Sequence, residues 1–513
     1  MRTFLTLAVA VGLLTAAPAS GQTAGAPAGL VASSATRRAV ALTWTAPDSS
    51  TSSFVVERKP LGASWTPPAP PAVSPIVSTP VTQAAFTDST IGPFATYVYR
   101  VRQLPASKTP GPPSNEITVG PPPVGFSQIL TPPASLKDPN QFADCLSMTL
   151  DANGDPAVVY FTFDPDNNAD NADSTLHFVS WSRAKYRWNP PVKVATVADI
   201  ASNGLRYGFS LTRDASTGQF GIVHMTGSRE VRLALSADEG VTWSDVSVQM
   251  VDEQSTLGEP TLAMDKGRLW IVYTGTDRDV VLVTGAATET PDKWTRSQAP
   301  LLPETFSPKR AGLQVTLDAA GKPAVLYWLD PNSGYNASLA LWRPDAKTVV
   351  KIADTKDSQS DVVDSRIVFN GSRASVAFHA RRDDQYFDNK HQIWVATSAD
   401  NGATWSGVVP LPNDGGNSVG PPVSIAVDGQ GNRVVVAPVD GGNDGDRKCG
   451  SPKLFRESAA GWTVCAPDSR GTAVTGSTQP RIAFADNNKL YIALRIYQDG
   501  GGLKSGLLLW RER

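Results

Sequence analysis

Arginines and carboxylates precede several strand-like segments of this chain, and their chemistry could define a binding or catalytic site. The arginines are Arg206, Arg310, Arg366 and Arg481, and the acids and phenol found with them are Asp144, Tyr207, Glu259 and Asp364. A guanidinium pairs bidentately with a carboxylate, so a cluster of arginines is typical of a site for an acidic ligand. The same arginines could instead pair with neighbouring Asp and Glu side chains and brace the fold. The sequence leaves both interpretations open.

Internal repeats determine where these residues would lie. Each unit reads as an apolar strand, a turn with Asp or Asn, and a second apolar strand, as in residues 147–161 and 314–328. The turn residues are Asp151, Asp214, Asp265, Asp318, Asn370, Asp428 and Asp486. Units of about 55 residues have room for four strands, which make one blade of a β-propeller. The sequence therefore predicts that residues 126–513 form a seven-bladed β-propeller, with six blades as the alternative.

The two ends of this repeat region predict ring closure. The last unit supplies only three strands and ends in the apolar segment 506–510. Residues 126–132 resemble the fourth strand of other units, such as WSGVVPLP at 405–412. We expect this early segment to complete the last blade, because the pairing would hide both free sheet edges.

Two turns, SADEGVTW at 236–243 and SADNGATW at 398–405, share the pattern SxDxGxTW. This pattern resembles the Asp box of sialidases and of other propellers with bacterial neuraminidase repeats. An Asp carboxylate can accept backbone N–H bonds within a turn, a Gly can take a positive φ, and a Trp can pack between sheets. We therefore expect structural roles for Asp238, Gly240, Trp243, Asp400, Gly402 and Trp405.

The resemblance also implies roles for the residues that precede the first strands. Sialidase-like enzymes bind a substrate carboxylate with an arginine triad and use a Tyr nucleophile, a helper Glu and an Asp acid/base. Residues 259–269, followed by Arg278, are similar to the sialidase stretch that carries the helper Glu and a triad arginine. On this basis the catalytic candidates are Glu259, Tyr207 and Asp144, and the ligand-binding candidates are Arg206, Arg278, Arg310 and Arg481. The Phe/Tyr-Arg-Ile-Pro segment of sialidases is absent, so the sequence leaves open whether the chain is an enzyme.

Residues 26–119 form a separate region in which apolar and polar residues alternate with period two, as in half-buried strands. Trp44 in an early strand and Tyr97 at the head of a late one predict an immunoglobulin-like sandwich with both residues in its core. The segment resembles a fibronectin type III domain in Trp44, the FVVERK strand and the closing SNEITV at 114–119. Residues 120–125, GPPPVG, are predicted to be a semi-rigid linker.

The N-terminus predicts export. A basic start, an apolar run at residues 4–14 and small residues at 16–21 form the pattern of a signal peptide over residues 1–21. We therefore expect a secreted, extracellular or periplasmic protein without membrane insertion. Three cysteines suit an oxidising compartment with at most one disulfide, predicted between Cys449 and Cys465, which leaves Cys145 buried and unpaired.

Charge and composition narrow the partners. A formal net charge of -2 attracts neither nucleic acid nor an anionic membrane, and 42 Gly with 41 Pro favour strands and turns over helices. Oxygen-bearing side chains alternate at Asp164, Asp166, Asn168 and Asp170, as in a calcium loop, although a solvated acidic loop is the alternative. No other cofactor is expected, and we expect a monomer. The sequence predicts a secreted glycan- or polymer-binding propeller, with glycoside hydrolase activity left open; the alternative is a non-catalytic adhesion or protein-interaction protein.

Overall fold

The computed structural model describes residues 25–47, 53–65, 81–105, 109–130, 144–163, 174–197, 209–226, 230–250, 260–275, 279–300, 306–308, 312–331, 337–354, 364–380, 392–412, 423–439, 450–465, 477–485, 488–496 and 506–512. These residues form strands and turns, with a short 3-10 helix η2 (Pro291–Lys293). Among them no helix has the length and apolar character needed to cross a membrane. The chain divides into two compact units: Met1–Gly120 with Arg183–Lys185, and Pro121–Ser182 with Tyr186–Arg513.

The first unit contains two three-stranded antiparallel sheets, ordered β1-β2-β4 and β3-β5-β6. Their strands are β1 (Ala28–Ala35), β2 (Val40–Thr45), β3 (Ser53–Pro60), β4 (Ala85–Asp88), β5 (Tyr97–Leu104) and β6 (Ile117–Val119). Alternate residues of β2 are buried because only one face of its sheet packs on the core. The predicted core residue Trp44 is buried and packs edge-on against Phe54, with ring centroids 5.4 Å apart. Tyr97 is half-buried and packs at the margin of the same cluster.

In the second unit the described residues form seven antiparallel sheets, numbered here sheets 1 to 7 by their first strands. Sheet 1 contains β8 (Asp144–Leu150), β9 (Pro156–Phe163), β10 (Ser174–Ser182), β11 (Arg187–Trp188) and β12 (Val192–Val197). Sheet 2 contains β13 (Phe209–Arg213), β14 (Phe220–Thr226), β15 (Glu230–Ser236) and β16 (Ser244–Met250), and sheet 3 contains β17 (Thr261–Asp265), β18 (Arg268–Thr274), β19 (Val280–Ala286) and β20 (Thr295–Gln298). Sheet 4 contains β21 (Phe306–Pro308), β22 (Gln314–Leu317), β23 (Pro323–Pro331), β24 (Ser338–Arg343) and β25 (Thr348–Asp354). Sheet 5 contains β26 (Asp364–Asn370), β27 (Arg373–Ala380), β28 (Gln392–Ser398) and β29 (Val409–Pro410). Sheet 6 contains β30 (Ser424–Val427), β31 (Arg433–Val439), β32 (Gly450–Ser458) and β33 (Gly461–Cys465). Sheet 7 contains β34 (Ser477–Ala485), β35 (Lys489–Ile496), β36 (Gly506–Arg511) and β7 (Gly125–Leu130).

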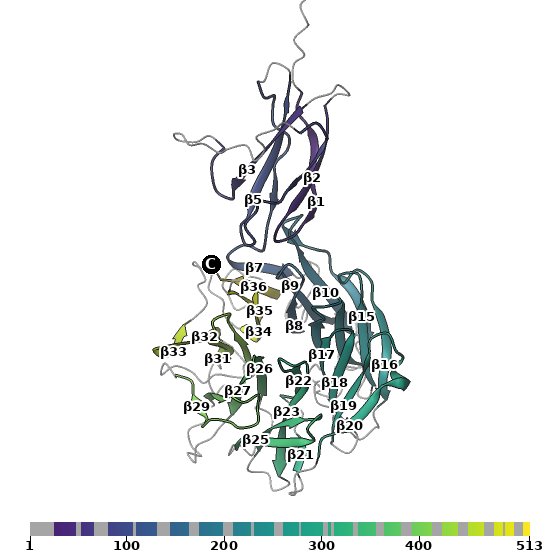
Figure 1. Cartoon of the computed structure of the whole chain (residues 1–513), viewed down its shortest axis with the longest axis vertical. Coiled ribbons are helices and arrows are strands. Elements are labelled where there is room, and N and C mark those ends of the chain that lie inside the picture. The colour runs from purple at the N-terminus through teal and green to yellow at the C-terminus, as the bar shows by residue number, and fades with distance from the viewer. Residues whose placement is uncertain are drawn as a thin grey trace, which may run out of the picture. The chain divides into compact units, whose positions relative to one another are not determined.

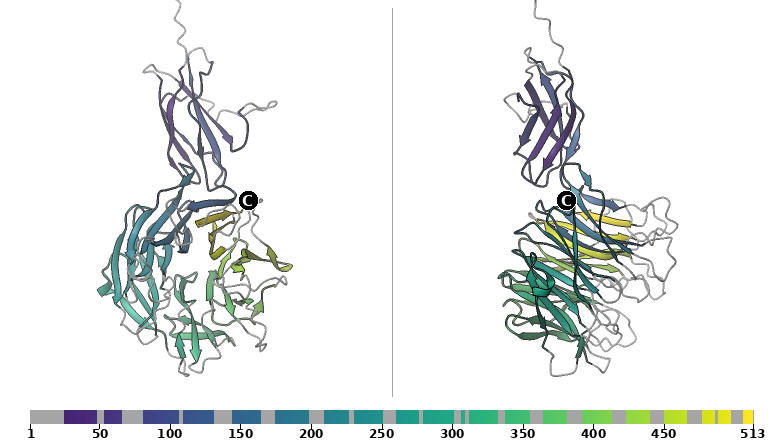
Figure 2. Two further views of the ribbon diagram at one scale, coloured as in Figure 1. Left: turned by 180° about the vertical axis from the view of Figure 1, so that it is seen from behind. Right: turned by 90° about the vertical axis from the view of Figure 1, so that its right-hand side faces the viewer.

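The first strands of these sheets contact one another in a closed cycle. The order is β8, β13, β17, β22, β26, β30 and β34, and β34 contacts β8 again. Figure 1 shows the sheets following one another around this ring, and Figure 2 shows the same ring from behind. The second unit is therefore an all-β, propeller-like ring of sheets.

The second strands explain why the sheets stack around a ring. In β18, Ile271 packs with residues of sheet 2, whereas Trp270 and Val272 pack with residues of sheet 4. Sheet 3 thus buries both of its faces, which requires a nearly continuous apolar run in its middle strands. The sequence RLWIVYT of β18 meets this requirement, and only its first residue is exposed.

The last sheet is completed by residues from the start of the unit, as the sequence predicted. Strand β7 pairs antiparallel with β36, so that Phe126 lies opposite Trp510 and Leu130 opposite Leu507. This pairing joins residues that are almost 400 positions apart in the chain. The first and last strands of the second unit are therefore hydrogen-bonded to each other in one sheet.

Candidate functional site

A cavity of about 410 Å³ lies where the first strands meet. We call it the axial cavity, because all seven sheets contribute to its wall. Its polar lining consists of Ser147, Ser210, Thr212, Thr261, Gln314, Thr316, Arg366, Ser424 and Arg481. The described residues that line it include two arginines but no Asp, Glu or Tyr. Its volume lies in the range of small-molecule and sugar pockets.

A repeated hydrogen bond places several of these polar side chains. The Ser147 Oγ accepts from the Leu211 N–H at 3.1 Å, and the Thr261 Oγ1 accepts from the Val315 N–H at 2.8 Å. The Ser424 Oγ accepts from the Ile482 N–H at 3.3 Å. In each case a first-strand side chain binds the backbone of the next sheet's first strand. We call these contacts inter-sheet latches.

The Gln314 side chain makes a double latch. Its Oε1 accepts from the Ile367 N–H at 2.8 Å, while its Nε2 donates to the Ile367 carbonyl at 3.2 Å. Sequence reasoning overlooked the latch residues, although a signal was present. Ser147, Thr261, Gln314 and Ser424 each stand four positions before the Asp of the following turn.

Arg366 occupies the same position in sheet 5, and there Asp364 provides the latch. The Asp364 Oδ2 accepts from the Val423 N–H at 2.7 Å, and its Oδ1 accepts from the Arg366 Nη1 at 2.9 Å. Arg366 Nη1 also donates to the Ser365 carbonyl at 2.8 Å. Asp364 is only 5% exposed, so this carboxylate connects sheets 5 and 6 and orients a cavity arginine.

Arg481 lines the axial cavity from sheet 7. It lies in β34 beside a register irregularity between Thr478 and Arg481, and its Nη1 donates to the Pro480 carbonyl at 3.2 Å. Of the predicted arginines, Arg366 and Arg481 therefore line one cavity although 115 residues separate them in the sequence. Arg366 is also paired with the acid Asp364.

Most of the other site residues predicted from the sequence lie outside the described residues. Arg206, Tyr207, Glu259, Arg278 and Arg310 lie outside the described residues, as do Asp164, Asp166, Asn168 and Asp170 of the predicted calcium loop. Asp144 is described only as the first backbone position of β8. Cys465 is exposed on β33 and its Sγ donates to the Leu454 carbonyl at 3.5 Å, whereas Cys449 lies outside the described residues. The disulfide and the catalytic assignments therefore stay predictions.

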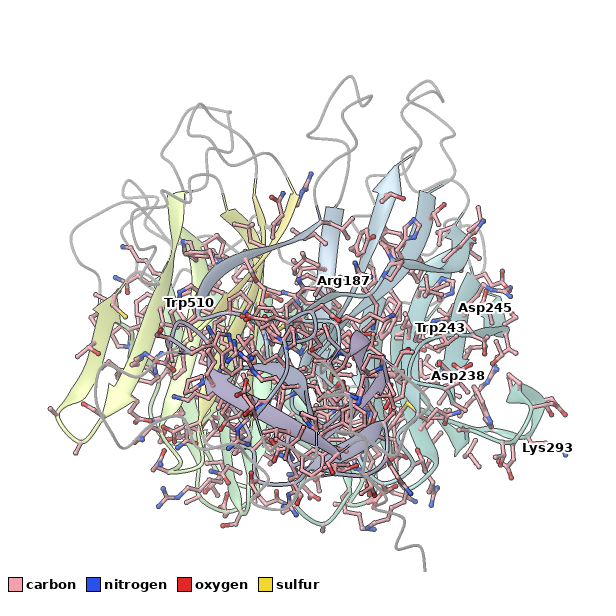
Figure 3. The ribbon with its side chains drawn as sticks, turned by 90° about the horizontal axis from the view of Figure 1, so that it is seen from above. Arg187, Asp238, Trp243, Asp245, Lys293 and Trp510 are labelled. Carbon is pink, nitrogen blue, oxygen red and sulfur yellow. The ribbon has the colours of Figure 1, made fainter. Side chains whose placement is uncertain are left out.

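The turn from β15 to β16 has the structure expected of its sequence (Figure 3). Asp238 accepts bonds from the Thr242 N–H at 2.9 Å and the Thr242 hydroxyl at 2.6 Å. The Thr242 bonds, together with one from the Ser236 hydroxyl, lower the pKa of Asp238 to about 2. Trp243 donates from Nε1 to the Gly240 carbonyl at 3.1 Å, and Gly240 has φ +86°.

The turn after β28 repeats this arrangement. Asp400 accepts from the Thr404 N–H at 2.8 Å and from the Thr404 hydroxyl, and Trp405 donates to the Gly402 carbonyl at 3.2 Å. Hydrogen bonds from Thr404 and Ser398 lower the pKa of Asp400 to about 2. In an antiparallel four-stranded sheet the third turn lies at the same end as the first turn and opposite the start of the first strand. These two turns therefore lie at the opposite end of their sheets from the starts of β13 and β26.

The turns between first and second strands use the repeated Asp in a similar way. Asp318 Oδ1 accepts from the Ala320 and Lys322 N–H groups, both at 2.9 Å. Burial opposes the ionisation of Asp214, but bonds from the Gly267 N–H, the Ser216 hydroxyl and nearby N–H groups lower its pKa to about 2. The Gly267 bond, at 2.6 Å, crosses from sheet 2 to sheet 3. These carboxylates stabilise turns and inter-sheet contacts, as expected for structural residues.

No protein-family model matches the sequence, and no curated protein matches it. The solved structures to which this chain is similar include an α-L-arabinofuranosidase of Fusarium graminearum in complex with arabinobiose. The two chains are 14% identical with a TM-score of 0.45, and the match covers 76% of this chain and 97% of that one. The NanB sialidase of Streptococcus pneumoniae gives 12% identity and a TM-score of 0.41, covering 76% and 70%. A lectin of Aleuria aurantia in complex with α-methyl-L-fucoside gives 11% identity and a TM-score of 0.38, covering 67% and 96%.

Proposed function

We propose that this chain is a secreted glycan-binding protein in which a seven-bladed, Asp-box β-propeller of the sialidase-like superfamily follows a fibronectin type III domain. The ligand site in this proposal is the axial cavity. The observation that carries it is the convergence of Arg366 and Arg481 with hydroxyl and amide side chains from the surrounding sheets on one space of about 410 Å³. Sugars present many hydroxyl groups, and a wall of hydrogen-bonding side chains in a concave site suits their recognition.

Binding has more support than hydrolysis. A glycosidase needs a carboxylate pair or a Tyr-Glu pair at the scissile bond. The described cavity wall carries neither, so catalysis would depend on Asp144, Tyr207 and Glu259 at the entry of the first strands. We therefore propose glycan binding as the function and treat hydrolysis as the question for a separate assay.

A glycan array tests the binding function. The full chain is expected to bind a subset of extracellular glycans, and the Arg481→Gln variant is expected to lose that signal. The matched control is Lys293→Gln, which neutralises an exposed cation on η2 at the periphery of sheet 3 (Figure 3). Binding that survives in Arg481→Gln, or an array without any signal, would overturn the cavity as the glycan site and favour a protein-interaction role.

A fluorogenic sialoside assay addresses hydrolysis. If the roles implied by the resemblance are correct, the wild-type chain releases the fluorophore and Glu259→Gln and Tyr207→Phe do not. Retained binding on the array without any fluorophore release would identify a binding protein that is not a sialidase.

A further inference from the structure

The latch hydrogen bonds determine which part of each side chain remains for a ligand. A hydroxyl has one proton to donate and lone pairs that accept. In Ser147, Thr261 and Ser424 a lone pair already accepts a backbone N–H from the next sheet. Among the described residues no group accepts a bond from these three hydroxyl protons. Three O–H donors are therefore left at the wall of the axial cavity.

The other cavity groups add further donors. Gln314 uses its Oε1 and one N–H in the double latch, which leaves its second N–H. The guanidinium groups of Arg366 and Arg481 have donors only. Asp364 is buried, is bonded at both carboxylate oxygens and is not among the described residues that line the cavity. The polar wall thus supplies donors from six of the seven sheets.

Two cations that only donate, together with hydroxyl groups that can donate to the same ligand atoms, favour a ligand group that carries negative charge and only accepts. Oxyanions have this property, and hydrogen bonds to a charged group are stronger than neutral ones. A sulfate ester has three terminal oxygens spread around its ester bond, so it can accept from several sides of a ring. A carboxylate has two oxygens in one plane and matches an encircling set of donors less well.

We propose that the axial cavity binds the sulfate ester group of a glycan. This inference rests on the proposed glycan-binding function and names the chemical class of ligand. In it, Arg481 and Arg366 compensate the charge, while the hydroxyls of Thr261, Ser147 and Ser424 donate to the sulfate oxygens. The latches act as positioning contacts, because they fix the direction in which each hydroxyl can donate.

Calorimetry on the full chain tests this with two matched probes, a chondroitin sulfate tetrasaccharide and its desulfated counterpart. Both carry carboxylates, so their difference isolates the sulfate. We expect at least about tenfold tighter binding of the sulfated form, equal to the loss of one hydrogen bond to a charged group. Sodium sulfate should compete with it, and sodium chloride at the same ionic strength should compete less.

Two variants connect the affinity to the cavity. Arg481→Gln and Thr261→Val are each expected to weaken binding of the sulfated probe about tenfold or more. The control is Thr274→Val, the same change at a buried residue of sheet 3 that does not line the cavity. Should Thr261→Val fail to fold without its latch, Arg481→Gln carries the test alone.

The outcomes separate the two proposals. Equal binding of both tetrasaccharides that is lost in Arg481→Gln would overturn the sulfate inference and leave the glycan-binding function in place. If the tetrasaccharides fail to bind while the array gives a cavity-dependent neutral glycan, the sulfate inference again fails alone. Binding that neither variant changes would place the ligand elsewhere and overturn both proposals.

Discussion

The two turns at residues 236–243 and 398–405 and the axial cavity are built in opposite ways. Each turn makes its characteristic bonds within a run of eight residues, so that Asp238 and Asp400 have the same partners at nearly the same distances. The lining residues of the cavity are spread between Ser147 and Ile482 in the sequence. The polar lining residues also differ in type among neighbouring sheets, as with Gln314, Arg366 and Ser424 of sheets 4, 5 and 6. A short motif can therefore predict the turn, whereas the cavity depends on the whole ring.

The two turns differ in the contacts of the residue after the Asp. This residue is Glu239 in one turn and Asn401 in the other, and both have φ +60°. Asn401 donates from Nδ2 to the Asp318 Oδ2 of the preceding sheet at 2.6 Å, whereas Glu239 lies 3.9 Å from Arg213 of its own sheet. The bonds within the turns are thus shared, and the contacts outside them differ.

The largest expected effect breaks a turn at its contact with the neighbouring sheet. In Gly240→Ala the new Cβ would lie 2.1 Å from Phe178 Cε1 at a φ of +86°. Backbone strain and overpacking together are expected to lower the free energy of unfolding by about 3 to 5 kcal/mol. Urea titration measures it.

The matched control for that change is Gly461→Ala in the third turn of sheet 6. Gly461 has φ +105° but nothing within 4 Å of the added Cβ, so strain alone is expected to cost about 1 to 2 kcal/mol. Equal losses in the two variants would show that packing against Phe178 contributes nothing.

A smaller effect is expected at the acid that pairs with the cavity residue Arg366. Asp364→Asn removes the carboxylate of this pair and weakens the bond to the Val423 N–H. The expected loss is about 2 kcal/mol of unfolding free energy, because hydrogen bonds to charged groups are involved. Asp345→Asn removes an exposed ion pair with Lys322 and should cost under about 0.5 kcal/mol. If the two variants are equally stable, the Asp364 latch is not a stabilising contact.

The pH dependence of stability tests the two turns that contain Asp238 and Asp400. The folded-state pKa values of Asp238 and Asp400 are about 2, below their ordinary value of 3.8. Their contribution to stability is therefore complete above the ordinary pKa and is lost as the pH falls toward 2. The double variant Asp238→Asn, Asp400→Asn should melt below wild type at pH 6, and the difference should narrow by pH 2.5. A difference that is constant with pH would contradict this.

The smallest effect is expected from the removal of metal ions. We predict that EDTA leaves the melting temperature unchanged, since a solvated acidic loop at residues 164–173 would need no ion. Added calcium that raises the melting temperature would identify a metal site, and Asp166→Asn would then abolish the increase.

Much of the architecture could be predicted from the sequence because it depends on local patterns. Alternating residues such as those of β2 predict a half-buried strand, and runs such as RLWIVYT predict a strand covered on both faces. The repeated turn Asp predicted where each sheet begins, and the pairing of β7 with β36 followed from the missing fourth strand. Even the blade-completing segment could be found by comparing it with residues 405–412.

The site itself depended on tertiary structure. A serine four positions before a turn, such as Ser147 or Ser424, is unremarkable in sequence, and it becomes a latch only when the next sheet brings a backbone N–H within hydrogen-bond distance. The sequence likewise proposed Arg366 and Arg481 among several arginines without showing that these two line one cavity. Hydrogen bonds within a turn depend only on a few residues that are close in the sequence, so the sequence by itself determined them. Convergence on a cavity needs seven sheets to close into a ring, and only the tertiary structure decided which side chains meet there.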